Sequence, residues 1–157
     1  MGLEIERKFL VKQGSEYSMM ASGSVDIVQG YLSERIDAIV RVRVYGNQAF
    51  LTVKSRNCGA VRREWEYAVP VNDALDMLAL PGVRKLSKTR YFVPISGVTW
   101  EVDVFHGRLE GLVIAEVEVE HPEQQLILPD FIGEEVTHDP RYFNSSLIGD
   151  EEKPPVL

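Results

Sequence analysis

The sequence predicts a mainly β protein of the α+β type: an eight-stranded antiparallel sheet closed into a barrel or tunnel with a charged lumen, and a few short helices outside it and at the C-terminus. Eight segments are expected to be extended, and nearly all of them carry charged side chains on alternate positions, which is the pattern of the two faces of a strand. Turn-forming residues separate several of these segments, as in antiparallel hairpins. Closure is expected because it removes the exposed edges of the sheet.

The elements follow in order along the chain. Strands are expected at residues 1–11, 25–32, 36–45, 49–54, 61–69, 85–93, 98–105 and 112–120, with hairpin turns at 46–48, 57–59, 96–97 and 106–111. Short helices are expected at residues 15–22, 73–80, 129–133 and 140–148, and Asn72 is the expected N-cap of the second. No linker or repeat interrupts this pattern, so we expect one domain over residues 1–150 and a flexible C-terminal tail over residues 151–157.

Composition and charge narrow the class of protein. A hydrophobic content of 45% and a charged content of 26% are typical of a globular chain. The net charge of −7 argues against a nucleic-acid groove, because an acidic field repels the phosphate backbone. No apolar run reaches membrane-spanning length, and the early first strand leaves no room for a secretory leader. Cys58 is the single cysteine, which excludes an internal disulfide and favours a reducing cytoplasm.

Charged side chains share one face on nearly every predicted strand. On the first strand, Glu4, Glu6 and Lys8 occupy alternate positions. For any strand taken alone, an ordinary solvated face is the better explanation. Taken together, the faces carry almost only carboxylate, guanidinium and ammonium groups, and consecutive carboxylates on the last strand require a cation between them. The other members are Arg41, Arg43, Lys54, Arg62, Glu64, Glu66, Lys88, Arg90, Glu101, Asp103, Glu116, Glu118 and Glu120.

This mixture of charges is typical of a site for a substrate with several phosphates. Arg and Lys bind phosphate oxygens, while carboxylates and phosphates together bind hard divalent ions such as Mg²⁺. The three histidines, His106, His121 and His138, fall in turns or near strand ends, and no His or Cys cluster indicates structural zinc. We therefore expect phosphate chemistry that uses a divalent metal.

Ten blocks of the sequence occur in an order that matches a known family. They are residues 4–8, in the pattern ExExK, and then 29–32, 41–43, 51–54, 63–67, 88–91, 100–105, 112–118, 135–139 and 142–144. In this order, over nearly the whole chain, they resemble the CYTH superfamily, also called triphosphate tunnel metalloenzymes, and its single-domain bacterial inorganic tripolyphosphatases. The chain departs from the family pattern at Ser55, where Gly is expected, and at Phe131, where Trp is common.

The resemblance implies a divalent-metal-dependent triphosphatase that hydrolyses inorganic tripolyphosphate to pyrophosphate and phosphate inside the tunnel. It implies Mg²⁺ or Mn²⁺ as cofactor, with two ions per site when substrate is bound. Carried over by position, the catalytic residues are Lys8, Tyr31 and Lys54. The substrate-binding residues are Lys8, Arg41, Arg43, Lys54, Lys88 and Arg90, and the metal ligands are Glu4, Glu6, Glu64, Glu66, Asp103, Glu116 and Glu118.

Other functions stay open from the sequence. Related tunnels convert ATP to cyclic AMP or hydrolyse thiamine or nucleoside triphosphates, and a non-catalytic polyphosphate-binding module would keep the basic residues. The full set of carboxylates disfavours the module. Tyr31 suits packing in the barrel wall as well as catalysis, whereas Trp65, Tyr67 and Trp100 lie on uncharged faces, where packing is expected. The expected partner is a small-molecule triphosphate, with no nucleic acid or membrane, and the chain is expected to be a monomer or homodimer.

Overall fold

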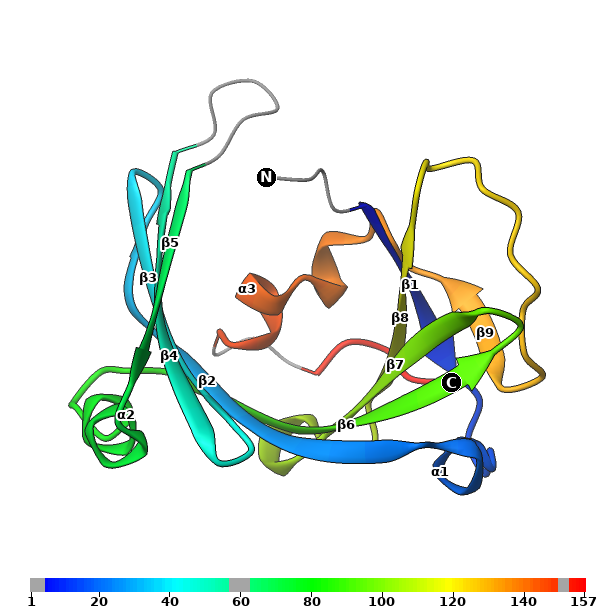
Figure 1. Cartoon of the computed structure of the whole chain (residues 1–157), viewed down its shortest axis with the longest axis horizontal. Coiled ribbons are helices and arrows are strands. Elements are labelled where there is room, and N and C mark those ends of the chain that lie inside the picture. The colour runs from blue at the N-terminus through cyan, green and yellow to red at the C-terminus, as the bar shows by residue number, and fades with distance from the viewer. Residues whose placement is uncertain (1–4, 57–62, 150–152) are drawn as a thin grey trace. The chain divides into compact units, whose positions relative to one another are not determined.

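The computed structural model describes residues 5–56, 63–149 and 153–157, which form mainly antiparallel β structure with a few short helices (Figure 1). The chain divides into two compact units, one of residues 26–87 and one of residues 1–25 and 88–157. Two long strands, β2 (Gly23–Arg35) and β6 (Lys85–Ile95), each run through both units. No helix in the described residues is long and apolar enough to cross a membrane.

The unit of residues 26–87 is an antiparallel meander with one helix packed on it. The predicted turn at residues 46–48 is present, with Gly46 at a φ of 61°. The helix packs Ala74 and Leu78 against apolar side chains of the strands. The charged side chains of the strands therefore gather on the opposite face. The elements are most of β2, then β3 (Ala38–Tyr45), β4 (Gln48–Ser55), β5 (Glu64–Val69) and α2 (Val71–Leu78).

Close packing on β2 requires a glycine at position 30. A Cβ built on Gly30 would lie 2.8 Å from the backbone oxygen of Arg84 and 3.0 Å from Cδ2 of Leu78. The carbonyl belongs to the main chain and cannot move aside as a flexible side chain would. The approach of α2 and the loop that follows it to β2 therefore depends on the absence of a side chain at Gly30.

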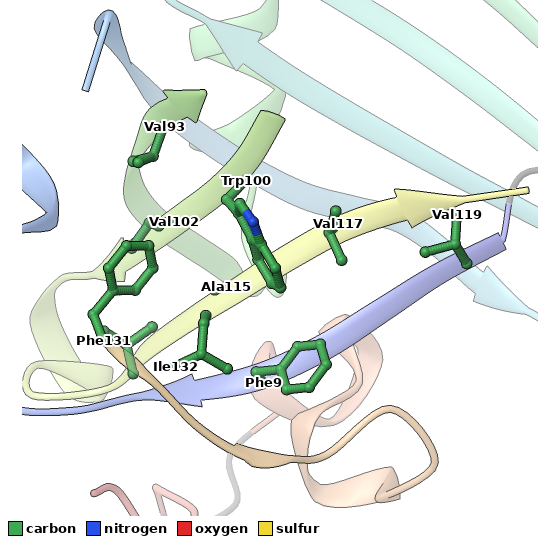
Figure 2. Close-up of a cluster of buried hydrophobic side chains, with 10 residues drawn as sticks. Phe9, Val93, Trp100, Val102, Ala115, Val117, Val119, Phe131 and Ile132 are labelled. Carbon is green, nitrogen blue, oxygen red and sulfur yellow. The ribbon is translucent and has the colours of Figure 1, made fainter. Parts of the chain in front are cut away.

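The other unit contains the strands in the hydrogen-bonded order β6-β7-β8-β1-β9. Their apolar side chains pack together on one face, with Phe9 of β1 meeting Trp100 of β7 edge to face at 5.6 Å between ring centroids (Figure 2). The predicted turn at residues 96–97 is present, with both residues at positive φ. The elements are β1 (Ile5–Val11), α1 (Tyr17–Met20), most of β6, β7 (Val98–Phe105), η1 (Gly107–Leu109), β8 (Val113–Val119), β9 (Ile132–Glu135), η2 (Pro140–Tyr142) and α3 (Asn144–Leu147).

Two predictions about the sheet are wrong. In the described residues the sheet has nine strands rather than eight, because β9 pairs with β1 where a helix at residues 129–133 was expected. The sheet is also not closed by hydrogen bonds, since β5 and β9 end the strand order within the described residues. The edge of β1 that does not pair with β8 is hydrogen-bonded to other segments. Strand β9 pairs with Phe9 and Val11, and the backbone N–H of Val136 donates to the backbone oxygen of Lys8 at 2.8 Å.

The helices also differ from prediction in their bounds. Helix α2 begins at Val71, so its N-cap is Pro70 rather than Asn72, and a proline suits this position because the first turn needs no N–H from it. The predicted helix at residues 140–148 is two short pieces, η2 and α3.

In the expected C-terminal tail, residues 153–157 contact the rest of the unit. The hydroxyl of Tyr142 donates to the oxygen of Pro155 at 2.6 Å, and Lys153 Nζ donates to the oxygen of Glu110 at 2.8 Å.

Candidate active site

Three strands of the unit of residues 1–25 and 88–157 bring charged side chains into register. Lys8 of β1 lies opposite Glu116 of β8, and Glu116 lies opposite Glu101 of β7. Glu6 and Glu118 form the next pair on the same face. Paired residues of neighbouring strands point to the same side, so these five side chains form one charged surface. The apolar cluster of Figure 2 occupies the opposite face.

The four carboxylates of this surface line one cavity of about 640 Å³. Partial burial, the charge of Glu116 and a hydrogen bond with that carboxyl together raise the pKa of Glu6 to about 7. Burial also raises the pKa of Glu101 above its ordinary value, although Arg90 opposes this shift. Crowded carboxyl groups hold protons more tightly because their charges repel one another. A cation bound among them would relieve that repulsion.

A buried network of ion pairs adjoins this surface on β6 and β7. Lys88 Nζ donates to Asp103 Oδ2 at 2.7 Å, and Arg90 donates to Asp103 from Nε at 2.8 Å and from Nη2 at 3.0 Å. Burial alone would raise the pKa of Asp103, but the charge of Lys88 and the hydrogen bonds from Arg90 hold it below its ordinary value. Arg90 Nη1 also lies 3.0 Å from Glu101 Oε2. Both oxygens of Asp103 are therefore engaged by cations.

Lys8 connects the charged surface to the segments that follow β9. Its Nζ lies 3.7 Å from Glu116 Oε1 and 3.5 Å from the backbone carbonyl oxygen of Tyr142. Tyr142 is a buried residue. Its backbone N–H donates to Thr137 Oγ1 at 3.0 Å. The position of the Lys8 ammonium group therefore depends on both β8 and the chain after β9.

The unit of residues 26–87 carries a second set of cations. Arg43 Nε donates to Gln29 Oε1 at 2.9 Å. Arg41 Nη2 lies 3.5 Å from Thr52 Oγ1 and 3.8 Å from Glu66 Oε2, and the hydroxyl of Thr52 donates to that same Glu66 oxygen at 2.9 Å. Gln29 and Thr52 are buried. Each guanidinium group thus contacts a buried, uncharged side chain on a neighbouring strand.

The structure places the predicted site residues on the charged face of each unit. Tyr31 lies opposite Arg41 and Lys54 lies opposite Glu64 in the strand register. Glu4 and Arg62 lie outside the described residues. One unit holds Glu6, Lys8, Lys88, Arg90, Asp103, Glu116 and Glu118, and the other holds Tyr31, Arg41, Arg43, Lys54, Glu64 and Glu66.

Three residues of these surfaces were missing from the sequence-based assignment. Glu101 was placed on the charged face but not among the predicted ligands. Its pairing with Glu116 in the strand register places it in the carboxylate cluster. Gln29 and Thr52 carry no charge, so a search for alternating charges does not find them. Both fall within blocks of the family resemblance, residues 29–32 and 51–54, but their positions opposite Arg43 and Arg41 depend on strand register.

The donors fit a hard divalent ion whose coordination is completed by substrate oxygens. Across residues 5–56, 63–149 and 153–157, no three His, Cys, Asp or Glu side chains form a ready-made metal site. The closeness of Glu116 contributes to the raised pKa of Glu6, however, and a bound cation would relieve the repulsion between these carboxylates. Mg²⁺ is usually held by one or two carboxylates together with substrate phosphates, rather than by a cage made only of protein.

Comparison with known proteins gives a consistent result. The family model described as CYTH domain matches residues 2–147. A protein of Acetivibrio thermocellus named inorganic triphosphatase is 46% identical over 149 residues, covering 94% of each chain. A protein of Nitrosomonas europaea with the same name is 39% identical over 148 residues, covering 92% of this chain and 95% of that one. A crystal structure described as an inorganic triphosphatase superimposes with a TM-score of 0.72 at 36% identity, covering 97% and 98% of the two chains.

Proposed function

The chain belongs to the CYTH domain family, and we propose that it is an inorganic triphosphatase that hydrolyses tripolyphosphate to pyrophosphate and phosphate. The observation that carries this proposal is the charged surface in which Lys8, Glu116 and Glu101 are in register. A surface that mixes cations with carboxylates suits a phosphate chain bound together with a divalent ion. The two relatives named inorganic triphosphatase support the choice of substrate.

In this proposal, the cations assigned by the family resemblance bind the triphosphate. Guanidinium groups present paired N–H donors that match phosphate oxygens, whereas ammonium groups act as point charges. Asp103 contacts both Lys88 and Arg90 and so holds these two cations in position for substrate. The proposed substrate-binding residues are Lys8, Arg41, Arg43, Lys54, Lys88 and Arg90.

The proposed cofactor is Mg²⁺ or Mn²⁺, with two ions per site when substrate is bound. Such ions neutralise phosphate charge and lower the pKa of a coordinated water. The cavity between β1, β7 and β8 supplies oxygen donors of the required kind. The proposed ligands are Glu6, Glu101, Glu116 and Glu118, together with Glu4, which lies outside the described residues.

The other acidic residues of the charged faces have a different role in this proposal. Asp103 is engaged by two cations, and Glu66 accepts a hydrogen bond from Thr52 beside Arg41. Glu64 is paired in register with Lys54. We propose that these carboxylates position the substrate-binding cations instead of holding metal.

Lys8, Tyr31 and Lys54 are the proposed catalytic residues. The transition state of phosphoryl transfer is loose, so positioning and electrostatic stabilisation contribute more than covalent chemistry. Lys8, whose ammonium group lies at the carboxylate cluster, and Lys54 would stabilise negative charge on the reacting phosphates. Tyr31 shares the face of Arg41 and would contribute a hydroxyl donor.

The test is to incubate the purified protein with Mg²⁺ or Mn²⁺ and with tripolyphosphate, ATP or thiamine triphosphate in parallel. We expect phosphate release from tripolyphosphate, with pyrophosphate as the second product. Phosphate release from ATP alone, or cyclic AMP as the product, would overturn the proposal. Tight binding of tripolyphosphate without any turnover would instead indicate a non-catalytic binding module.

We also propose that the enzyme acts in the cytoplasm as a monomer or homodimer. The single cysteine, Cys58, supports a reducing compartment, because the chain gains no internal disulfide from an oxidising one. Sedimentation of the purified protein at several concentrations measures its oligomeric state.

A further inference from the structure

Gln29 is a buried, uncharged residue within a charged face. It lies in β2 directly opposite Arg43 of β3, and the next pair on the same face is Tyr31 with Arg41. Its side chain is 1% exposed. A buried primary amide has two donor hydrogens and one acceptor oxygen to satisfy, so each of its ends needs a partner.

The contact with Arg43 determines which way the Gln29 amide points. Arg43 Nε lies 2.9 Å from the Gln29 side chain, and an arginine nitrogen can only donate a hydrogen bond. The atom that it contacts must therefore be the carbonyl oxygen, Oε1. The Nε2 group consequently lies at the other end of the amide, directed away from Arg43 Nε.

That Nε2 group has no hydrogen-bond partner among the described residues, although it is buried. Two other buried side-chain nitrogens of the described residues share this condition: Arg41 Nε and Trp100 Nε1. Trp100 belongs to the apolar cluster of the other unit. Gln29 and Arg41, in contrast, lie on the same face of neighbouring strands. Unsatisfied buried donors are rare in native proteins, so two on one face indicate a ligand that supplies acceptors.

The chemistry of the neighbours identifies this ligand. Both unsatisfied atoms are donors. One belongs to the guanidinium group of Arg41, and the other belongs to Gln29, which contacts the guanidinium group of Arg43. The ligand therefore carries acceptor oxygens and negative charge. The nearby Glu66 Oε2 accepts a hydrogen bond from Thr52 at 2.9 Å and lies 3.8 Å from Arg41 Nη2, so it does not serve as an acceptor for Arg41 Nε. The oxygens of a phosphate chain meet these requirements. A neutral amide adds a donor here without adding another positive charge to the two that repel each other.

We infer that Gln29 is a substrate-binding and positioning residue: its Oε1 holds the guanidinium group of Arg43, and its Nε2 donates to a phosphate oxygen of the triphosphate. This inference rests on the proposed function. It gives Gln29 two separate contributions, one through Arg43 and one directly to substrate. Two substitutions separate these contributions. Gln29→Glu keeps an acceptor oxygen for Arg43 but removes the donor to substrate. Gln29→Met keeps the length of the side chain but removes both the acceptor and the donor.

The experiment measures kcat and KM for tripolyphosphate with Mg²⁺, and calorimetric affinity for tripolyphosphate in metal-free buffer. Gln13→Glu is the matched control, because Gln13 is exposed in the turn after β1 and undergoes the same chemical change. For both Gln29 variants we expect KM and the metal-free Kd to rise by about 10- to 100-fold, the scale of one hydrogen bond to a charged group. We expect kcat to change much less, because the contact is present in the ground state as well as in the transition state.

The possible outcomes separate the inference from the function on which it rests. If wild-type protein neither binds nor hydrolyses tripolyphosphate, the proposed function fails. If wild-type protein is active and Gln29→Glu is folded with KM and Kd like those of the control, the inference is wrong and water alone satisfies Gln29. If only thermal stability falls in both variants, Gln29 has a structural role and the inference is likewise overturned. If Gln29→Met does not fold, Gln29→Glu carries the test.

Discussion

Replacing Asp103 with Asn tests the role of the buried network directly. The substitution keeps the shape of the side chain but removes its charge, and the new amide nitrogen would face a cation that can only donate hydrogen bonds. Removing one partner of a buried ion pair costs about 3–5 kcal/mol, because the remaining charge stays buried without compensation. Lys88 and Asp103 are each 1% exposed, so we expect the free energy of unfolding to fall by this amount.

The assay is urea unfolding at neutral pH, with Asp37→Asn as the matched control. Asp37 also meets an arginine, Arg56, at 2.6 Å, but these side chains are 54% and 62% exposed. An exposed pair contributes less than about 1 kcal/mol. If Asp103→Asn costs no more than this control, the buried network does not stabilise the fold.

Acid and metal dependence provide two further checks on Asp103. Its pKa in the folded protein is held below the ordinary value of 3.8, so its stabilising contribution is present above that pH and is lost as the pH falls through the folded-state pKa. The stability difference between wild type and Asp103→Asn is therefore expected to shrink in acid.

The Asp103→Asn variant is expected to need the same Mg²⁺ concentration as wild type for activity but a higher concentration of tripolyphosphate. A raised Mg²⁺ requirement with an unchanged KM would make Asp103 a metal ligand.

Three further predictions concern single positions. Lys54→Ala and Glu116→Ala are each expected to lower turnover of tripolyphosphate by at least about 100-fold, the scale of losing one electrostatic stabiliser. Wild-type turnover in either folded variant would remove that residue from the site. Gly30→Ala is expected to lower the free energy of unfolding by about 1–3 kcal/mol, because its Cβ would lie 2.8 Å from the backbone oxygen of Arg84, and an unchanged melting temperature would contradict this. In metal-free protein, the raised pKa of Glu6 means that the unfolded state loses this proton first, so stability is expected to fall between pH 4.5 and about 7. Glu6→Gln is expected to abolish this fall in chemical unfolding, and an unaltered profile would assign the titration to another group.

Strand alternation predicted which side chains share a face but not which neighbours they meet. Lys8 and Glu116 could be assigned to charged faces because alternate residues of a strand point the same way. Their pairing depends on the register between β1 and β8. The packing of Phe9 and Val117 on the opposite face specifies that register, because a slip of one residue would exchange the two faces.

The same limit explains other differences from the sequence-based assignment. The family resemblance assigned Asp103 to the metal ligands, which stays a prediction, whereas its contacts with Lys88 and Arg90 depend on the pairing of β6 with β7 and could not be predicted. Strand β9 was missed because it is only four residues long and begins within residues 129–133, where a short helix was predicted. Its pairing with β1 depends on contacts distant in the sequence. Gln29 carries no charge, and its contact with Arg43 depends on the register between β2 and β3.

The division of the chain between the two units affects the order in which they can form during synthesis. Residues 26–87 are contiguous, so their strands can pair as soon as this stretch has left the ribosome. Strand β1 is made earlier, but its partners on β8 and β9 are made much later, and Thr137 is 129 residues beyond Lys8. Until then the apolar side chains of Phe9 and Val11 lack their packing partners and are available to chaperones. The surface that carries Lys8 is therefore assembled only after translation has passed β9.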